Sequence, residues 1–213
     1  LCSSITQITI PSSVKSIGNY AFFNCNKLKQ ISIPSTITSI GDDVFDKISS
    51  LEISGSIKRI HKKMFKNHSS LKKIVIPPSV TVIDNDAFNG CDLLEDVIMS
   101  SIIHIGTKAF KNCKSLKKIE IPPTVRSIAS KAFCNCHSLN EISLPQSVFS
   151  IRSKAFVNCI SLSKVNISSP IHYCGCRLFN GCKSLNTISI PKSMNSDLLG
   201  ISDIGCKIWL DRI

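Results

Sequence analysis

Cysteine has the widest chemistry of any side chain in this sequence, and the chain holds eleven of them. Thiolates ligate zinc, act as nucleophiles or pair as disulfides. Seven of them occupy one position of a repeating pattern: Cys2, Cys25, Cys91, Cys113, Cys136, Cys159 and Cys182. On stacked strands about 5 Å apart their side chains would point in parallel, which suits disulfide geometry poorly. We therefore expect a ladder of buried free thiols that pack as small apolar residues.

A zinc half-site is the other interpretation of the cysteines. His172, Cys174 and Cys176 form the sequence HYCGC. A structural zinc site needs four ligands, usually from two separated pairs. The second Cys-x-Cys pair, Cys134 and Cys136, falls in a different part of its repeat unit. We expect no metal and no other cofactor.

The sequence contains no motif that is typical of a catalytic site. None of the five histidines lies in a nucleophile motif, and there is no glycine-rich phosphate loop. Asp42 and Asp43 follow a glycine and are typical of turns. A repeat code for RNA needs base-reading and stacking side chains on every unit, and these are missing. The sequence predicts a protein that is not an enzyme and has no specific nucleic-acid readout.

Charge is the stronger functional signal. The net charge of +12 and the pI near 9.3 favour acidic partners, such as an acidic protein surface or an acidic glycan. Five basic residues share one repeat position, which Asp86 interrupts. They are Lys63, Lys108, Lys131, Lys154 and Arg177. Four of them fall on consecutive units and predict a basic stripe that can follow an acidic polymer, although plain solvated lysines are the alternative.

Two further surfaces are candidates for partner contacts. One is a basic cluster that can hold an anion: Lys58, Arg59, Lys62, Lys63 and Lys66. The other lies on the expected outer face of the strands: Lys73, Val75, Ile98, Lys118 and Glu120. This second surface is mixed in charge and poor in the aromatic residues that dominate binding hot spots, so a solvated sheet is its alternative.

The element that must position these side chains is a repeat of about 23 residues. Its marker is a phenylalanine, which recurs at Phe22, Phe45, Phe65, Phe88, Phe110, Phe133, Phe156 and Phe179. A fixed period in this range indicates a solenoid, in which each unit buries its apolar face against the next. Most apolar residues therefore have a structural role, and function must come from what the units display outward.

The unit at 116–136 reads LKKIEIPPTVRSIASKAFCNC. The Ile-x-Ile at 119–121 alternates as a short strand does, and the two prolines that follow end it. Val125 and Ile128 form a second short segment, and the spacing at 132–136 fits a turn of helix. We expect short parallel β-strands stacked in a ladder, with one short helical turn or irregular segment per rung and about nine rungs.

Two departures from the period divide the chain. The unit after Phe45 is three residues short, so that Leu51 fills a strand position, and we expect an irregular rung near 45–66. After Pro191 the phenylalanine is lost. We therefore assign residues 1–190 to the solenoid and 191–213 to a degenerate terminal rung or cap, because solenoid ends need non-standard units.

The repeating blocks resemble the BspA-like leucine-rich repeat family. They appear as LKQISIPSTITSIG at 28–41 and as AFKNC at 109–113, in phase over nearly the whole chain. The resemblance implies a leucine-rich-repeat solenoid. It also implies a role among the surface antigens and adhesins of bacteria and parasitic protists, which bind matrix proteins or host cells.

The functional expectation is a non-enzymatic repeat module that binds a protein or a glycan. A cell-surface or secreted adhesion and antigen protein is the leading interpretation. The alternative is an intracellular scaffold of the cytoplasm or cytoskeleton that lies along an acidic assembly, and the unpaired cysteine ladder favours it. No apolar run in this sequence approaches the ~20 residues of a membrane helix, and no oligomeric state is predicted.

Overall fold

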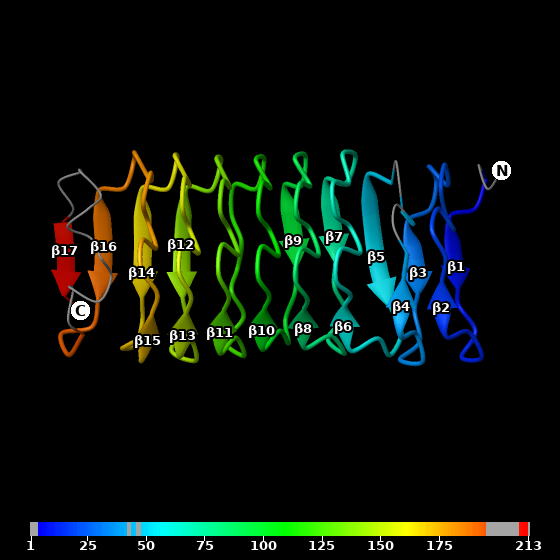
Figure 1. Cartoon of the computed structure of the whole chain (residues 1–213), viewed down its shortest axis with the longest axis horizontal. Coiled ribbons are helices and arrows are strands. Elements are labelled where there is room, and N and C mark those ends of the chain that lie inside the picture. Colours follow the sequence, from blue (N-terminus) through cyan, green and yellow to red (C-terminus); the bar gives the residue numbers. More distant parts are fainter. Residues whose placement is uncertain (1–3, 42–43, 46–47, 195–208, 213) are drawn as a thin grey trace.

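The computed structural model describes residues 4–41, 44–45, 48–194 and 209–212. The chain winds into an elongated β-solenoid whose rungs lie side by side along one axis (Figure 1). Each turn, except the one that contains residues 117–121, contributes a strand to a first layer and a shorter strand to a second layer, and the arrows of the two layers point in opposite directions (Figure 1). Neighbouring strands within a layer are parallel, as in Ile142↔Val165 and Ile128↔Ile151.

The first layer forms two sheets, ordered β1-β3-β5-β7-β9 and β12-β14-β16-β17. Its strands are β1 (Gln7–Thr9), β3 (Gln30–Ser32), β5 (Ser50–Ser54), β7 (Lys73–Val75), β9 (Asp96–Ile98), β12 (Glu141–Leu144), β14 (Lys164–Ile167), β16 (Thr187–Ile190) and β17 (Trp209–Arg212). The alternation of buried isoleucine with exposed polar residues, as in Glu141–Leu144, produces these strands.

The second layer forms a six-stranded sheet, β15-β13-β11-β10-β8-β6, and the pair β2-β4. Its strands are β2 (Ser16–Ile17), β4 (Ser39–Ile40), β6 (Arg59–Ile60), β8 (Val82–Ile83), β10 (His104–Ile105), β11 (Ser127–Ile128), β13 (Ser150–Ile151) and β15 (Tyr173–Cys174). These eight strands mark eight turns of the solenoid within the described residues, against the nine rungs expected. The predicted solenoid of stacked parallel strands is confirmed.

The segment that returns the chain to the first layer consists of turns, and the part of the chain that the structure describes contains no helix. Two non-glycine residues with positive φ explain this. In the turn at 129–136 they are Lys131 (φ 57°) and Asn135 (φ 62°). Left-handed residues four positions apart interrupt right-handed helical geometry. Of the two alternatives predicted for this part of each rung, the irregular segment is therefore correct and the helical turn is not.

The core is a column of stacked phenylalanine rings. Phe65 and Phe88 have centroids 5.1 Å apart and an interplanar angle of 1°, and Phe133 and Phe156 lie 5.3 Å apart at 3°. The ladder cysteines from Cys91 to Cys182 pack beside this column as buried free thiols, and Cys136 Sγ donates to the Phe110 carbonyl at 3.1 Å. Cys2 lies outside the described residues.

The irregular rung is accommodated by a register step within β5. On one side Ile53 pairs with Ile31, and on the other Leu51 pairs with Ile74. Leu51 and Ile53 are both buried, because a step of two residues keeps the same side chains on the core face. Leu51 therefore fills the strand position, as predicted.

One predicted strand is wrong. Residues 117–121 make no ladder pairs, and the first layer is interrupted there, between β9 and β12. Ile119 and Ile121 are still buried in the core. In the preceding corner Ile105 follows Val97 by eight positions, whereas Ile128 follows Ile119 by nine. Corner length alone does not account for the lost ladder, because Ile60 follows Ile53 by only seven positions and β5 still pairs on both sides.

At the C-terminal end, β17 adds to the first layer, and Leu210 pairs with Ile188. Leu210 follows Ile188 by 22 positions, which is one fewer than the repeat spacing of 23. Residues 195–208 and 213, which include most of the predicted terminal rung or cap, lie outside the described residues. In the described part of the chain there is no helix that could cross a membrane.

Candidate partner-binding surfaces

The basic stripe lies in one column of left-handed backbone positions. The φ angles of its four members are 57° at Lys108, 57° at Lys131, 61° at Lys154 and 54° at Arg177, and the same column holds Lys63 (φ 61°) and Asp86 (φ 58°) outside the stripe. Backbone bonds join neighbouring turns here, such as Lys131 N to Ser153 O at 3.2 Å. Glycine or asparagine adopts this conformation more readily than lysine, so local backbone preference does not explain the recurrence of lysine.

The stripe belongs to a half of the solenoid that is almost free of acids. Residues 97–194 hold 13 of the Lys and Arg residues and 2 of the Asp and Glu residues, and so carry +11 of the net charge of +12. The two acids are Glu120 and Glu141, and both lie within 3.9 Å of Lys118 on the first layer. No ion pair within the described residues involves a member of the stripe. Its positive charge is therefore uncompensated.

The basic cluster near the irregular rung is different, because acids of the next rung face it. Arg59 on β6 lies 3.4 Å from Asp84. Burial lowers the pKa of neighbouring His61, and Asp84 opposes that shift. Lys63 belongs to the column of the stripe, next to Asp86, whereas Lys58, Lys62 and Lys66 are separate positions on the same turn. Arg59 in this cluster is therefore paired with an acid, whereas no stripe member has an ion pair within the described residues.

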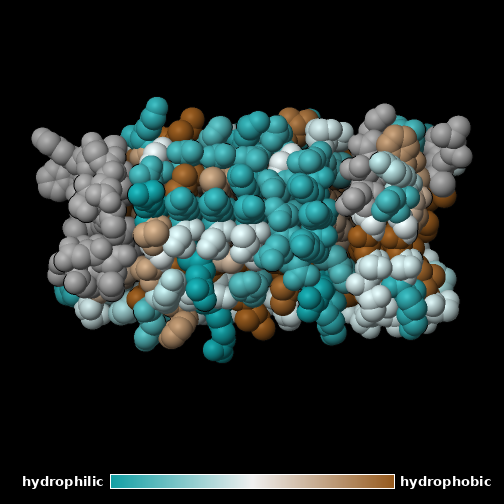
Figure 2. Space-filling view, viewed as in Figure 1, coloured by the Kyte–Doolittle hydropathy of each residue, from teal (hydrophilic) through white to brown (hydrophobic). Residues whose placement is uncertain are grey.

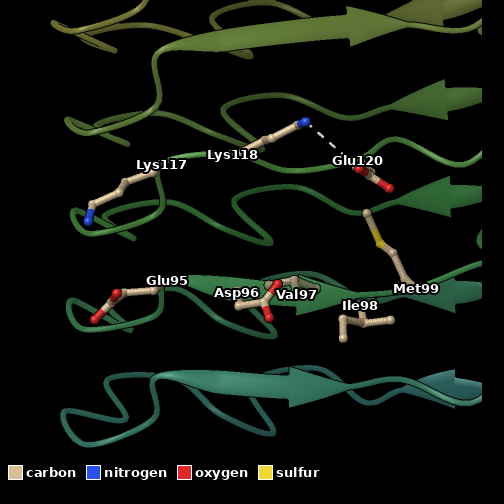
Figure 3. Close-up of a pocket in the computed structure, with 8 residues that line it drawn as sticks. All are labelled: Glu95, Asp96, Val97, Ile98, Met99, Lys117, Lys118 and Glu120. Carbon is tan, nitrogen blue, oxygen red and sulfur yellow. Dashed lines mark ion pairs between the residues drawn. The ribbon is translucent and has the colours of Figure 1, made fainter.

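The strand-face candidates fall in two separate places. Ile98, Lys118 and Glu120 line one groove of about 450 Å³, which opens where the first layer is interrupted (Figure 3). Lys73 and Val75 line another depression, of about 440 Å³, with Gln30 and Glu52 among its other residues. The structure thus brings three of the five candidates together and leaves two apart.

The charges on this strand face are paired with one another. Lys73 lies 3.0 Å from Asp96, and Lys118 lies 3.9 Å from Glu120 (Figure 3). Exposed pairs of this kind contribute little to stability, but each acid lowers the local charge that Lys73 or Lys118 presents to a partner. In the view of Figure 2, hydrophilic residues form long bands along the solenoid, and apolar residues appear only as small groups between them.

The zinc motif does not assemble. His172 stacks on Phe149 with centroids 4.5 Å apart, Cys174 packs against the core, and Cys176 is exposed. In the part of the chain that the structure describes, no group of three or more His, Cys, Asp or Glu residues could hold a metal ion. The side chains of His172, Cys174 and Cys176 therefore lie in three different environments and do not converge on one site.

The thiols outside the ladder differ in acidity. A hydrogen bond from Ser153, with Arg177 and Lys154 nearby, lowers the pKa of exposed Cys176. Desolvation raises the pKa of Cys134, although three lysines oppose the shift. Burial raises the pKa of Cys174 to about 11.

We therefore expect Cys176 to react first with iodoacetamide at pH 7.5. A lowered pKa increases its thiolate fraction at that pH, and the thiolate is the nucleophile. Cys174 and Cys91, whose pKa values are about 11 and about 12, should react at least roughly tenfold more slowly. Timed alkylation with peptide mapping by mass spectrometry measures these rates. Equal labelling of Cys176 and Cys91 would contradict the prediction.

One surface was not predicted from the sequence, because aromatic residues make up only 6% of the chain as a whole. The second layer gathers Arg126, Phe149, Arg152, His172 and Tyr173 on three adjacent turns, and we call this group the aromatic–arginine patch. Phe149 and Tyr173 are 55% and 46% exposed. The signal was available in the repeat, because positions 126, 149 and 172 lie 23 residues apart and form one outward column.

Comparison with known proteins identifies the repeat. The BspA type leucine-rich repeat region matches residues 1–117 and 103–197, in six copies. The structure is similar to a leucine-rich repeat protein from Eubacterium ventriosum, with 23% identity, a TM-score of 0.51, and coverage of 100% of this chain and 73% of that one.

The pneumococcal vaccine antigen PcpA is also similar in structure, with 16% identity, a TM-score of 0.52, and coverage of 98% of this chain and 79% of that one. At these identities the likeness shows the fold alone. No curated protein matches the chain. The family blocks extend over nearly all of the sequence and coincide with the rungs of the solenoid. The chain therefore belongs to the BspA-type leucine-rich repeat family.

Proposed function

We propose that this protein is a non-enzymatic binding module that holds an acidic partner, a protein or a glycan, along the basic stripe. The observation that carries the proposal is the uncompensated charge of residues 97–194, which have two acids among them, both on the first layer beside Lys118. A row of cations about 5 Å apart repels itself. A linear polyanion relieves this repulsion and gains contacts on every turn.

We further propose a cell-surface or secreted location. The family assignment supports this, and a structurally similar protein is described as a vaccine antigen. One observation favours the alternative of an intracellular scaffold. Five ladder cysteines (Cys91, Cys113, Cys136, Cys159 and Cys182) are buried free thiols, a state that a reducing compartment preserves.

Retention on heparin tests the basic stripe. The test variant replaces Lys108, Lys131, Lys154 and Arg177 with asparagine, which tolerates the left-handed backbone. The control variant makes the same change of charge at four other exposed lysines, Lys15, Lys29, Lys72 and Lys117. We expect the test variant to lose at least about tenfold in affinity and the control about threefold or less.

The elution salt concentration and a direct affinity titration provide the two readouts. Equal losses in the two variants would show that net charge alone governs retention, and the stripe would then not be the site. Thermal unfolding of both variants verifies that the solenoid is intact.

A further inference from the structure

We propose that the aromatic–arginine patch docks an acidic protein segment that carries aromatic or aliphatic side chains. The patch is distinct from the basic stripe, because its residues lie in or next to the strands of the second layer and combine apolar rings with guanidinium groups. It therefore goes beyond the attraction of a polyanion that the stripe provides.

The rings of the patch are held in place before any partner arrives. Phe149 and His172 stack at 4.5 Å with an interplanar angle of 19°, and the Phe149 carbonyl accepts a hydrogen bond from His172 N at 3.0 Å. Arg152 Cζ lies 4.8 Å from the centroid of the Tyr173 ring. Side chains restrained in this way lose little conformational entropy on binding, which favours affinity.

Exposure separates these rings from the buried phenylalanine column, and among the described residues Tyr20 and Phe23, which are 56% and 42% exposed, share this property. The other aromatic column, that of the phenylalanine repeat, is buried from Phe45 to Phe179, whereas Phe149 and Tyr173 keep about half of their surface in water. Aromatic residues and arginine are enriched at the centres of protein interfaces, where they supply most of the binding energy. The composition of the patch is that of a hot spot and not that of a solvated sheet.

Charge complementarity selects an acidic partner. Arg126 and Arg152 are exposed, and no ion pair within the described residues involves either of them. The residues of the patch lie in or next to β11, β13 and β15, and Glu141 is the single acid in the sequence from 121 to 194. Guanidinium groups bind carboxylates with two parallel hydrogen bonds. A protein segment offers both carboxylates for the arginines and apolar side chains for the rings, whereas a densely sulfated glycan presents mainly anionic groups.

The test uses two polymers as probes, poly-glutamate and a random copolymer of glutamate and tyrosine. We expect the chain to bind the copolymer more tightly than poly-glutamate. The variant Phe149→Ser/Tyr173→Ser should lose at least about tenfold in affinity for the copolymer, with little change for poly-glutamate or heparin. The variant Arg126→Gln/Arg152→Gln should weaken binding of both polymers.

A matched control replaces two exposed apolar residues outside the patch, Leu93→Ser and Ile160→Ser, which are 43% and 41% exposed. An equal loss in this control would overturn the proposal, because general stickiness would explain the binding. Unchanged copolymer binding by Phe149→Ser/Tyr173→Ser would also overturn it. A loss of heparin retention as large as the loss of copolymer binding would identify a glycan site instead.

The stripe variant separates this proposal from the proposed function. If the stripe variant loses heparin retention but keeps its preference for the copolymer over poly-glutamate, the two surfaces act independently. If it loses that preference, the patch is not a site of its own and the proposal fails. Thermal unfolding of every variant excludes misfolding as the cause, since all the substituted side chains are exposed or half-buried.

Discussion

Replacing Phe133 with alanine should lower the free energy of unfolding by about 3–5 kcal/mol. The ring is fully buried and stacks at 5.3 Å on both Phe110 and Phe156. Its removal opens a cavity between two turns and breaks two ring contacts at once. Because each turn contacts only its neighbours, the loss falls on the interfaces that couple the two halves of the solenoid.

Two comparisons make this prediction specific. Phe133→Leu keeps most of the volume and should cost about 1–2 kcal/mol. Phe22 is only partly buried and stacks on one ring, that of Phe45 at 5.7 Å, so Phe22→Ala should cost about 1–2 kcal/mol. Urea unfolding followed by circular dichroism provides the three values. A cost for Phe22→Ala as large as that for Phe133→Ala would show that the column does not act through stacking on both sides.

The strands were predictable because their signal is local. The Ile-x-Ile pattern places alternate side chains on the core face, and proline ends the ladder, so that β12 and β16 fall where the pattern puts them. Even the three-residue deletion was interpreted correctly at Leu51. A strand repeats every two residues, so a register step of two maintains burial and the pattern alone is sufficient.

The return segments were harder to predict, because lysine carries no signal for a left-handed backbone. Apolar spacings of one, three and four residues at 132–136 fit a helix as well as a turn. The decisive feature is the asparagine column: Asn135 Nδ2 donates to Asn112 Oδ1 at 2.8 Å, and Asn158 Nδ2 donates to Asn135 Oδ1 at 3.0 Å. This amide ladder depends on contacts between turns, which a single unit cannot show.

The repeat phase predicted which residues of the candidate surfaces align in one column, but it did not predict which neighbouring charges surround them. Repeat phase alone aligned Lys108 with Lys131 and Lys154, and the structure places them at one backbone position. Whether a charge is compensated depends on neighbours in adjacent turns, as Asp84 beside Arg59 illustrates. The aromatic–arginine patch was missed because a count of aromatic residues in the whole chain conceals how they cluster after folding.

The turn that follows the irregular rung holds a histidine at the ladder position, and its substitution by alanine should cost about 2–4 kcal/mol. His68 is buried where most other turns have cysteine, and Ile48 occupies the same position in the irregular rung. Its Nε2 bonds the Phe45 carbonyl, and its Nδ1 accepts from Leu71 N at 3.1 Å. Alanine would remove both side-chain bonds and leave a cavity in the core, and only its backbone carbonyl would remain to accept from Leu71 N.

Cysteine at the same position is the matched variant, because the fold already shows how a thiol serves there. In the next turn Cys91 Sγ donates to the Phe65 carbonyl at 2.9 Å, and Leu94 N bonds the Cys91 carbonyl at 3.1 Å. The same two bonds are open to His68→Cys, at the Phe45 carbonyl and at Leu71 N. We therefore expect His68→Cys to cost about 1 kcal/mol or less.

Urea unfolding of the two variants under reducing conditions separates two explanations of the histidine. If His68→Cys is as destabilising as His68→Ala, the volume of the ring and not its hydrogen bonds holds the trimmed turn in place. If the stability of His68→Cys is close to that of the wild type, the requirement at the ladder position is a side chain that donates a hydrogen bond to the phenylalanine carbonyl of the preceding turn. Histidine and cysteine are then two solutions to the same requirement, which explains how the solenoid continues through a rung that has lost three residues.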